Sequence, residues 1–206
     1  MTEKLKLTGA AGDIEALLDR PEGEPAAVAV VCHPHPLFQG TMHNKVAHML
    51  ARAFTDLGAL ALRFNFRGVG GSAGEHGRGD GETDDTVAVA GWLRERNPAL
   101  PFWLGGFSFG AMVALRAARQ LEPAALVTVA PPTDRLGRLA RPACPWLLLQ
   151  GEDDDVVGAD SVLEWARAFE SPPDIATFAG VGHFFHGNLN ALRDTVTNRL
   201  PALLGE

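Results

Sequence analysis

The chain has 206 residues and a formal net charge of −7 at pH 7. Its composition, 46% hydrophobic and 21% charged, is that of an ordinary globular domain and excludes intrinsic disorder. The acidic balance and the dispersed basic residues argue against a nucleic-acid or anionic-membrane surface, and the absence of tyrosine excludes any mechanism that needs a tyrosine acid or base.

Eight strands are predicted along the chain. Apolar residues alternate on both sides of a turn at 9–13, which predicts an antiparallel hairpin at the start of the sequence. Continuous apolar runs then predict strands that are buried on both faces of a parallel sheet. These runs cover 26–32, 59–64, 102–107, 124–130, 146–149 and, more weakly, 175–179.

Segments with the apolar spacing of helices follow most of these runs. They cover 45–57, 83–96, 111–121, 161–169 and 190–204. Alternating strands and helices are typical of a mostly parallel sheet with helices on both faces. The sequence therefore predicts one α/β domain, residues 1–206, with an eight-stranded sheet whose first two strands are antiparallel.

The sharpest motif is Gly106-x-Ser108-x-Gly110, which follows a predicted strand and opens a predicted helix. The two glycines relieve crowding, so the serine can occupy a strained turn with its hydroxyl exposed. The free N–H groups of the helix behind it would stabilise a developing oxyanion. The same pattern would also suit a glycine-rich turn with a helix-capping serine.

A serine hydroxyl is a poor nucleophile without a base, so this interpretation requires a histidine and a carboxylate. The strand at 146–149 leads to three adjacent aspartates, 153–155, which spacing alone cannot separate. The strand near 175 leads to His183, flanked by glycine, with His186 as the second candidate. Loops at the carboxyl ends of parallel strands meet at one edge of the sheet, so we expect these groups to converge.

Three motifs together resemble the α/β-hydrolase superfamily, and more narrowly a group of small bacterial predicted hydrolases. They are CHPHP at 32–36, RFNFRGVG at 63–70 and GFSFG at 106–110, and the resemblance extends over essentially the whole chain. The resemblance implies Ser108 as nucleophile, His183 as base and Asp154 as acid, because Asp154 lies three residues after the glycine that ends its strand. Asp153 and Asp155 remain alternatives.

The resemblance also implies an oxyanion hole built from backbone amides. Phe109, directly after the nucleophile, supplies one donor. The second is expected in the loop after the strand at 26–32, where Pro34 and Pro36 have no N–H. The His35 amide is therefore the better candidate, with Leu37 in reserve.

Two cofactor interpretations compete with this one. His33, His35, His43 and His48 could suggest zinc, but their loop is locked by prolines and lacks a nearby carboxylate. The glycine-rich segment 67–72 could suggest a phosphate-binding loop, but no helix follows it directly. We expect neither metal nor organic cofactor.

Two further expectations concern the neighbourhood of segment 67–72. Many superfamily members have aspartate where this chain has Asn65, which puts any salt bridge made there with Arg67 in doubt. The acidic residues of 80–85 are expected to be the solvated start of the next helix.

The segment 131–145 leaves room for one short turn, at 134–139, where many α/β hydrolases insert a cap. We therefore expect an open site, roofed only by loops with apolar side chains that suggest an acyl or alcohol pocket. These residues are Leu37, Phe38, Phe107, Phe109, Phe184 and Phe185.

The sequence thus predicts a serine hydrolase that cleaves an ester or thioester through an acyl-enzyme. The alternatives are an amidase or peptidase for small substrates and a non-catalytic binding protein that keeps the fold. Cys32 and Cys144 are too few for a disulfide scaffold, and no secretory signal or membrane-length apolar run is visible. We expect a cytoplasmic protein whose partner is a small molecule rather than nucleic acid or a membrane.

Overall fold

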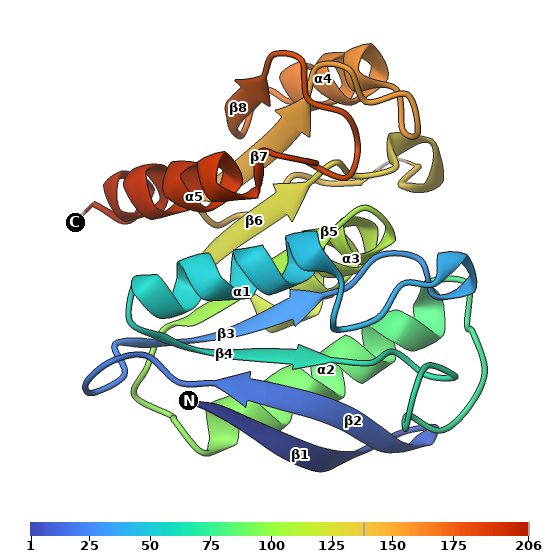
Figure 1. Ribbon diagram of the computed structural model, residues 1–206, viewed down its shortest axis with the longest axis vertical. Coiled ribbons are helices and arrows are strands. Elements are labelled where there is room, and N and C mark those ends of the chain that lie inside the picture. Colours follow the sequence, from blue (N-terminus) through green and yellow to red (C-terminus); the bar gives the residue numbers. More distant parts are fainter. Residues whose placement is uncertain (138, 206) are drawn as a thin grey trace.

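A computed structural model describes residues 1–137 and 139–205. Its centre is one eight-stranded sheet with the order β1-β2-β4-β3-β5-β6-β7-β8 (Figure 1). The strands are β1 (Thr2–Gly9), β2 (Gly12–Asp19), β3 (Ala27–Cys32), β4 (Ala59–Phe64), β5 (Phe102–Phe107), β6 (Ala125–Val129), β7 (Trp146–Gly151) and β8 (Asp174–Phe178). β1 and β2 pair antiparallel, β2 pairs antiparallel with β4, and the other neighbours are parallel. The predicted sheet is confirmed.

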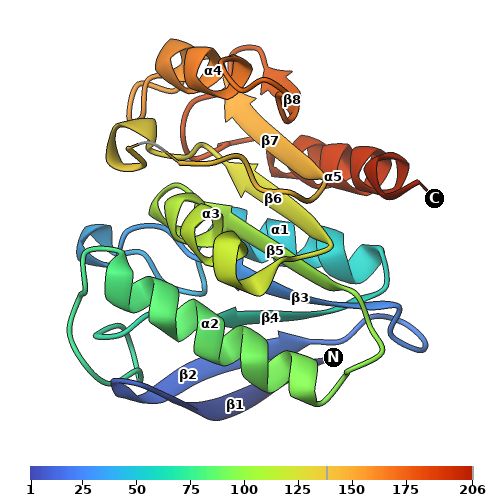
Figure 2. The same cartoon turned by 180° about the vertical axis from the view of Figure 1, so that it is seen from behind.

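Helices cover both faces of the sheet. They are α1 (Lys45–Asp56), α2 (Asp80–Glu95), α3 (Phe109–Leu121), α4 (Ala159–Arg167) and α5 (Leu189–Leu204). α1 and α5 lie in front of the sheet in Figure 1, whereas α2 and α3 lie in front in Figure 2, seen from behind. Two apolar clusters match this division, one beneath α1 and α5 and one beneath α2, α3 and α4. The continuous apolar strands are buried because both faces are covered.

The acidic residues at the start of α2 correct one expectation. Asp80 and Asp84 are exposed, but Glu82 and Asp85 are buried at 0% and 1% exposure. They are buried because each has partners in the preceding loop: Glu82 accepts hydrogen bonds from its amides, and Asp85 pairs with Arg67. The expectation of a solvated run was therefore wrong for these two residues.

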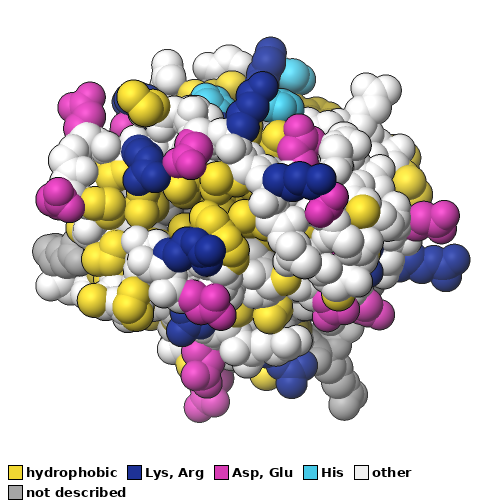
Figure 3. Space-filling view, turned by 90° about the horizontal axis from the view of Figure 1, so that it is seen from below, with side chains coloured by type: hydrophobic (Ala, Val, Ile, Leu, Met, Phe, Trp, Pro, Cys, Tyr) yellow, Lys and Arg dark blue, Asp and Glu magenta, His cyan; other side chains and the backbone are white. Residues whose placement is uncertain are grey.

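Within residues 1–137 and 139–205, no cap covers the sheet edge. Only a loop and the short 3₁₀ helix η2 (Thr133–Arg135) separate β6 from β7 among the described residues. The turn predicted at 134–139 includes Arg138, which lies outside them. Where the structure describes the chain, it contains no helix long and apolar enough to cross a membrane. Seen from the β1 side, basic and acidic side chains are interspersed around a cluster of hydrophobic ones (Figure 3).

Candidate active site

Ser108 occupies a sharp turn between β5 and α3, with φ 54° and ψ −121°. A Cβ atom at Gly106 would lie 2.2 Å from the Gly110 carbonyl oxygen, and one at Gly110 would lie 2.3 Å from the Cys32 carbonyl oxygen. Only glycine therefore allows the strand, the turn and β3 to approach this closely. The Ser108 side chain makes no capping hydrogen bond, so it is not a helix-capping serine.

The Ser108 hydroxyl instead lies in a chain of three side chains from three loops. Its Oγ lies 3.1 Å from Nε2 of His183, and Nδ1 of His183 lies 2.8 Å from Oδ2 of Asp154. Of the three adjacent aspartates, Asp154 is buried, whereas Asp153 and Asp155 are exposed. His186, the second candidate base, is also exposed. The loops after β5, β7 and β8 thus bring Ser108, Asp154 and His183 together at one sheet edge.

Asp154 is held as a carboxylate. Its Oδ1 accepts hydrogen bonds from the amides of Val156 and Val157 at 3.0 and 3.1 Å, and its Oδ2 accepts one from Gln150 Nε2 at 3.1 Å. Burial acts to raise the pKa of Asp154, but the hydrogen bond and charge of His183, together with these donors, outweigh it and lower the pKa. An ionised Asp154 accepts a hydrogen bond from Nδ1–H of His183, which leaves Nε2 free to accept a proton from Ser108.

Two backbone amides near Ser108 have no internal acceptor. Across residues 1–137 and 139–205, neither the Phe109 nor the His35 amide donates a hydrogen bond. The Leu37 amide donates to Nδ1 of the His35 ring at 3.2 Å, so it is already occupied. The Phe109 amide also begins α3, where the free N–H groups of a helix favour negative charge.

His33 fixes the loop that carries His35. Its Nδ1 donates to the Pro34 carbonyl oxygen at 2.6 Å, and its Nε2 accepts from the Phe66 amide at 3.0 Å. Burial lowers the pKa of His33 to about 4, so the ring is neutral at pH 7. Both ring nitrogens are in use, and within the described residues no group of three or more metal-binding side chains is found. In this arrangement, His33 has no free ring nitrogen to offer a metal.

The loop 65–79, including the glycine-rich segment 67–72, is held by buried polar contacts. Arg67 makes a bidentate pair with Asp85 at 3.0 and 2.7 Å, so the arginine has an acidic partner although Asn65 is not one. Asn65 instead donates to Glu15 Oε2 at 2.7 Å and accepts from the Met42 amide at 2.9 Å. Sequence reasoning missed Asp85, because its partner precedes it by 18 residues in a loop without regular spacing.

The apolar side chains around Ser108 divide into two groups. Leu37 and Phe38 are 69% and 77% exposed, and Phe184 is 48% exposed. Val156, which sequence reasoning missed, is 60% exposed in the loop of Asp154. The other three predicted pocket residues are buried in the core: Phe107, Phe109 and Phe185. Phe107 is the last residue of β5, and its ring packs 4.9 Å from that of His183, so the prediction that it lines an open pocket was wrong.

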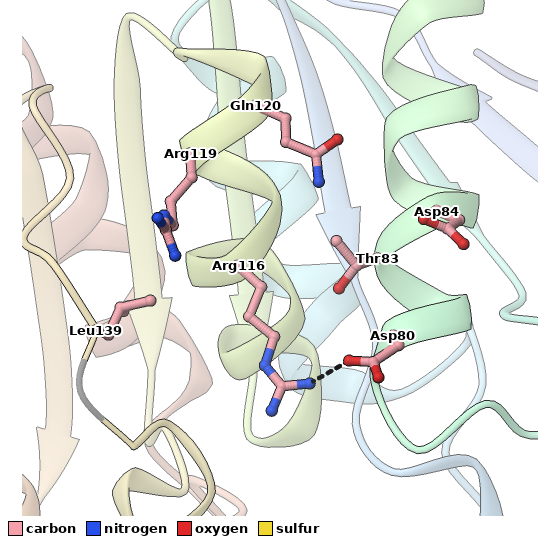
Figure 4. Close-up of a pocket in the computed structure, with 7 residues that line it drawn as sticks. All are labelled: Asp80, Thr83, Asp84, Arg116, Arg119, Gln120 and Leu139. Atoms are coloured by element: carbon pink, nitrogen blue, oxygen red, sulfur yellow. Dashed lines mark hydrogen bonds and ion pairs between the residues drawn. The ribbon is translucent and has the colours of Figure 1, made fainter.

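A separate hollow lies between α2 and α3 and has a volume of about 500 Å³ (Figure 4). No member of the Ser108–His183–Asp154 chain lines it. Two arginines, Arg116 and Arg119, and two aspartates, Asp80 and Asp84, line it, and Arg116 donates to Asp80 at 3.2 Å.

Comparison with known proteins places the chain in a family. Residues 23–143 match the family model described as serine aminopeptidase, S33. An uncharacterized protein of Rickettsia prowazekii is 34% identical over 194 residues, covering 88% of this chain and 82% of that protein.

Two solved structures are also similar. A Xanthomonas campestris protein, described as an α/β serine hydrolase without a lid, shares 42% identity and a TM-score of 0.92 over 96% of this chain and 92% of its own. A Coxiella burnetii α/β serine hydrolase homologue shares 40% identity and a TM-score of 0.93 over 96% and 97%. The chain belongs to the S33 serine aminopeptidase family of α/β hydrolases, and it is a hydrolase of the lidless α/β type.

Proposed function

We propose that the protein hydrolyses carboxylic esters or thioesters through an acyl-enzyme, with Ser108 as nucleophile, His183 as base and Asp154 as the acid that orients it. The observation that carries this proposal is the unbroken chain from Ser108 Oγ through His183 to Asp154, at 3.1 and 2.8 Å. Such a chain activates a serine because the imidazole can take its proton as the C–O bond forms.

The reaction would proceed in two similar halves. Ser108 Oγ attacks the substrate carbonyl carbon while its proton passes to Nε2 of His183. The amides of Phe109 and His35 would hold the resulting oxyanion. The tetrahedral intermediate collapses, and the leaving alcohol or thiol takes the proton from His183. Water then attacks the acyl-enzyme by the same route and releases the acid and free Ser108.

The apolar rim of the site supports a substrate with an apolar group. Leu37, Phe38 and Phe184 present exposed hydrophobic surface from two of the loops that flank Ser108. Covering such surface with an acyl or alcohol chain gains about 25 cal/mol for each Å² removed from water. The small-molecule partner is therefore proposed to be an ester or thioester with an apolar side, bound without a metal or organic cofactor.

An amidase or peptidase activity is the second candidate. It is favoured by the matched family, whose description names an aminopeptidase. A matched pair of p-nitrophenyl ester and p-nitroanilide with the same acyl group separates the two. A higher kcat/KM on the ester supports the proposal, and a higher value on the anilide supports the alternative.

The direct test of the hydrolase proposal compares Ser108→Ala with Ser161→Ala, a control on the exposed surface of α4. Loss of the nucleophile is expected to lower kcat on a p-nitrophenyl ester by about 10⁴–10⁶-fold. The control is expected to retain wild-type kcat. An equal loss of kcat in both variants, or a wild-type kcat in Ser108→Ala, contradicts the proposal. An inactive wild-type protein would favour a binding role.

We also propose that the protein is cytoplasmic, because thiols stay free in a reducing compartment. Cys32 and Cys144 are both free thiols, one buried and one half-buried. Burial raises the pKa of the Cys32 thiol to about 12, which keeps it protonated and unreactive.

A further inference from the structure

Three aromatic rings meet beside the proposed oxyanion hole, and one of them belongs to a residue that the proposed mechanism does not use. The ring of His76 lies 4.9 Å from that of His35 and 5.6 Å from that of Phe109, while the His35 and Phe109 rings lie 4.7 Å apart. The three residues come from three different segments: the loop after β3, the loop before α2 and the first residue of α3. His76 therefore contacts both residues whose amides are proposed to bind the oxyanion.

A buried carboxylate stands behind His76. Glu82 is 0% exposed, and its two oxygens accept hydrogen bonds from the amides of Gly77 and Gly79 at 2.8 and 2.7 Å. Burial acts to raise the pKa of Glu82, but these backbone donors outweigh it and lower the pKa, so the group stays ionised. Glu82 thereby fixes the backbone directly after His76.

The two side chains are in close polar contact without a hydrogen bond. Nδ1 of His76 lies 2.7 Å from Oε1 of Glu82, but outside the angular range of a hydrogen bond. His76 is also largely enclosed, with 16% of its side chain exposed. A ring held between a buried anion and two other rings has little freedom to change its orientation.

We propose that His76, held by Glu82, is a positioning residue that sets the distance between the His35 and Phe109 amides of the oxyanion hole. This inference rests on the proposed function for its catalytic meaning. No backbone hydrogen bond joins His35 to Phe109 among the described residues, so side-chain packing contributes to holding the two amides in register. Misplacing a preorganised donor by about 1 Å can cost about 100-fold in rate.

The test compares His76→Ala, which removes the ring, with His76→Phe, which keeps a ring but removes the nitrogens. His76→Ala is expected to lower kcat on a p-nitrophenyl ester by about 10–100-fold while KM changes by less than about threefold. His76→Phe is expected to restore kcat to within about threefold of wild type, because ring packing sets the distance. His48→Ala, on the exposed surface of α1, is the matched control and should retain wild-type kcat.

A second measurement does not depend on activity. In ¹H–¹⁵N spectra, the amide signals of both His35 and Phe109 are expected to shift in His76→Ala and to return toward wild-type positions in His76→Phe. Unchanged amide signals, or a kcat in His76→Ala within twofold of wild type, would overturn the inference, as would a change confined to KM. If wild-type protein proves inactive, the proposed function fails, and the two amide signals alone decide whether His76 positions them.

Discussion

The Ser108 hydroxyl projects from a strained backbone turn. A non-glycine residue with φ 54° and ψ −121° lies outside the favoured regions, and such conformations cost about 1–3 kcal/mol. The surrounding contacts enforce it: the Ser108 amide donates to the Val129 carbonyl oxygen at 2.8 Å, and its own carbonyl accepts from Ala111 and Met112. The strain places Oγ where His183 can reach it.

Asp154 offers a test with two neighbours as controls. Asp154→Asn keeps the shape of the side chain but removes the charge that favours the Nδ1–H tautomer of His183, so kcat is expected to fall by about 10³–10⁴-fold. Asp153→Asn and Asp155→Asn change exposed residues, and their kcat is expected to stay within about twofold of wild type. Steady-state ester hydrolysis measures all three. A larger loss in either neighbour than in Asp154→Asn would contradict the assignment.

His33 makes the stability of the fold depend on pH. Burial lowers its pKa from 6.5 to about 4, so between these values the unfolded chain binds a proton at His33 that the folded chain does not. Stability from this site is complete above pH 6.5 and is lost as pH falls toward 4, by about 2 kcal/mol between pH 7.5 and pH 5.

Urea unfolding at the two pH values measures this term. Between pH 7.5 and pH 5, the free energy of unfolding of His33→Gln is expected to fall by about 2 kcal/mol less than that of wild type. His43→Gln changes an exposed histidine and serves as the control. If the free energy of unfolding falls equally in His33→Gln and wild type, folding does not lower the pKa of His33.

For single residues, the sequence predicts which ones form a motif better than it predicts which polar side chains are buried. Ser108 and His183 could be found because flanking glycines mark tight loops at strand ends. Glu82 and Asp85 could not be recognised as buried, because their partners lie in a loop without periodic spacing. His76 was missed for the same reason: nothing in the sequence places it against Phe109, 33 residues further on.

Among the elements, β3, β5 and α3 are packed more closely than any side chain allows. Because a Cβ at Gly110 would lie 2.3 and 2.4 Å from the carbonyl oxygens of Cys32 and His33, Gly110→Ala must push α3 away from β3. We expect a loss of about 3 kcal/mol in the free energy of unfolding, the upper end of overpacking costs.

Gly91 provides the matched control for that prediction. It lies within α2, and a Cβ there would have no atom within 4 Å. Gly91→Ala is therefore expected to stabilise the protein by about 0.5–1 kcal/mol, because alanine favours the helix. Urea unfolding of both variants should give changes of opposite sign. A gain of stability in Gly110→Ala would mean that backbone entropy, not close contact, governs Gly110.

The element boundaries show where sequence patterns are strong. The six parallel strands were predicted to within two residues, because their continuous apolar runs suit a strand buried on both faces and are too short for a buried helix. α2 begins at Asp80 rather than 83, because polar residues in a first turn carry no apolar period. α3 begins at Phe109, directly after Ser108, which apolar spacing alone does not show.

The whole molecule is a minimal hydrolase scaffold with an uncovered sheet edge. The short segment between β6 and β7 allowed the missing cap to be predicted, and the lidless relative from Xanthomonas campestris has the same feature. The prediction that residues 1–206 form one domain stays a prediction, supported by a single sheet that takes strands from Thr2 to Phe178. Selectivity would then depend on the exposed rim of Leu37, Phe38 and Phe184 rather than on a closing lid.

The most direct measurement of the central claim is covalent labelling with a fluorophosphonate, followed by mass spectrometry of the digested protein. The proposed mechanism predicts one modified residue, Ser108, in wild-type protein, and no modification in Ser108→Ala. Labelling of Ser108→Ala to the wild-type extent, or a modification mapped to a residue other than Ser108, would contradict the mechanism.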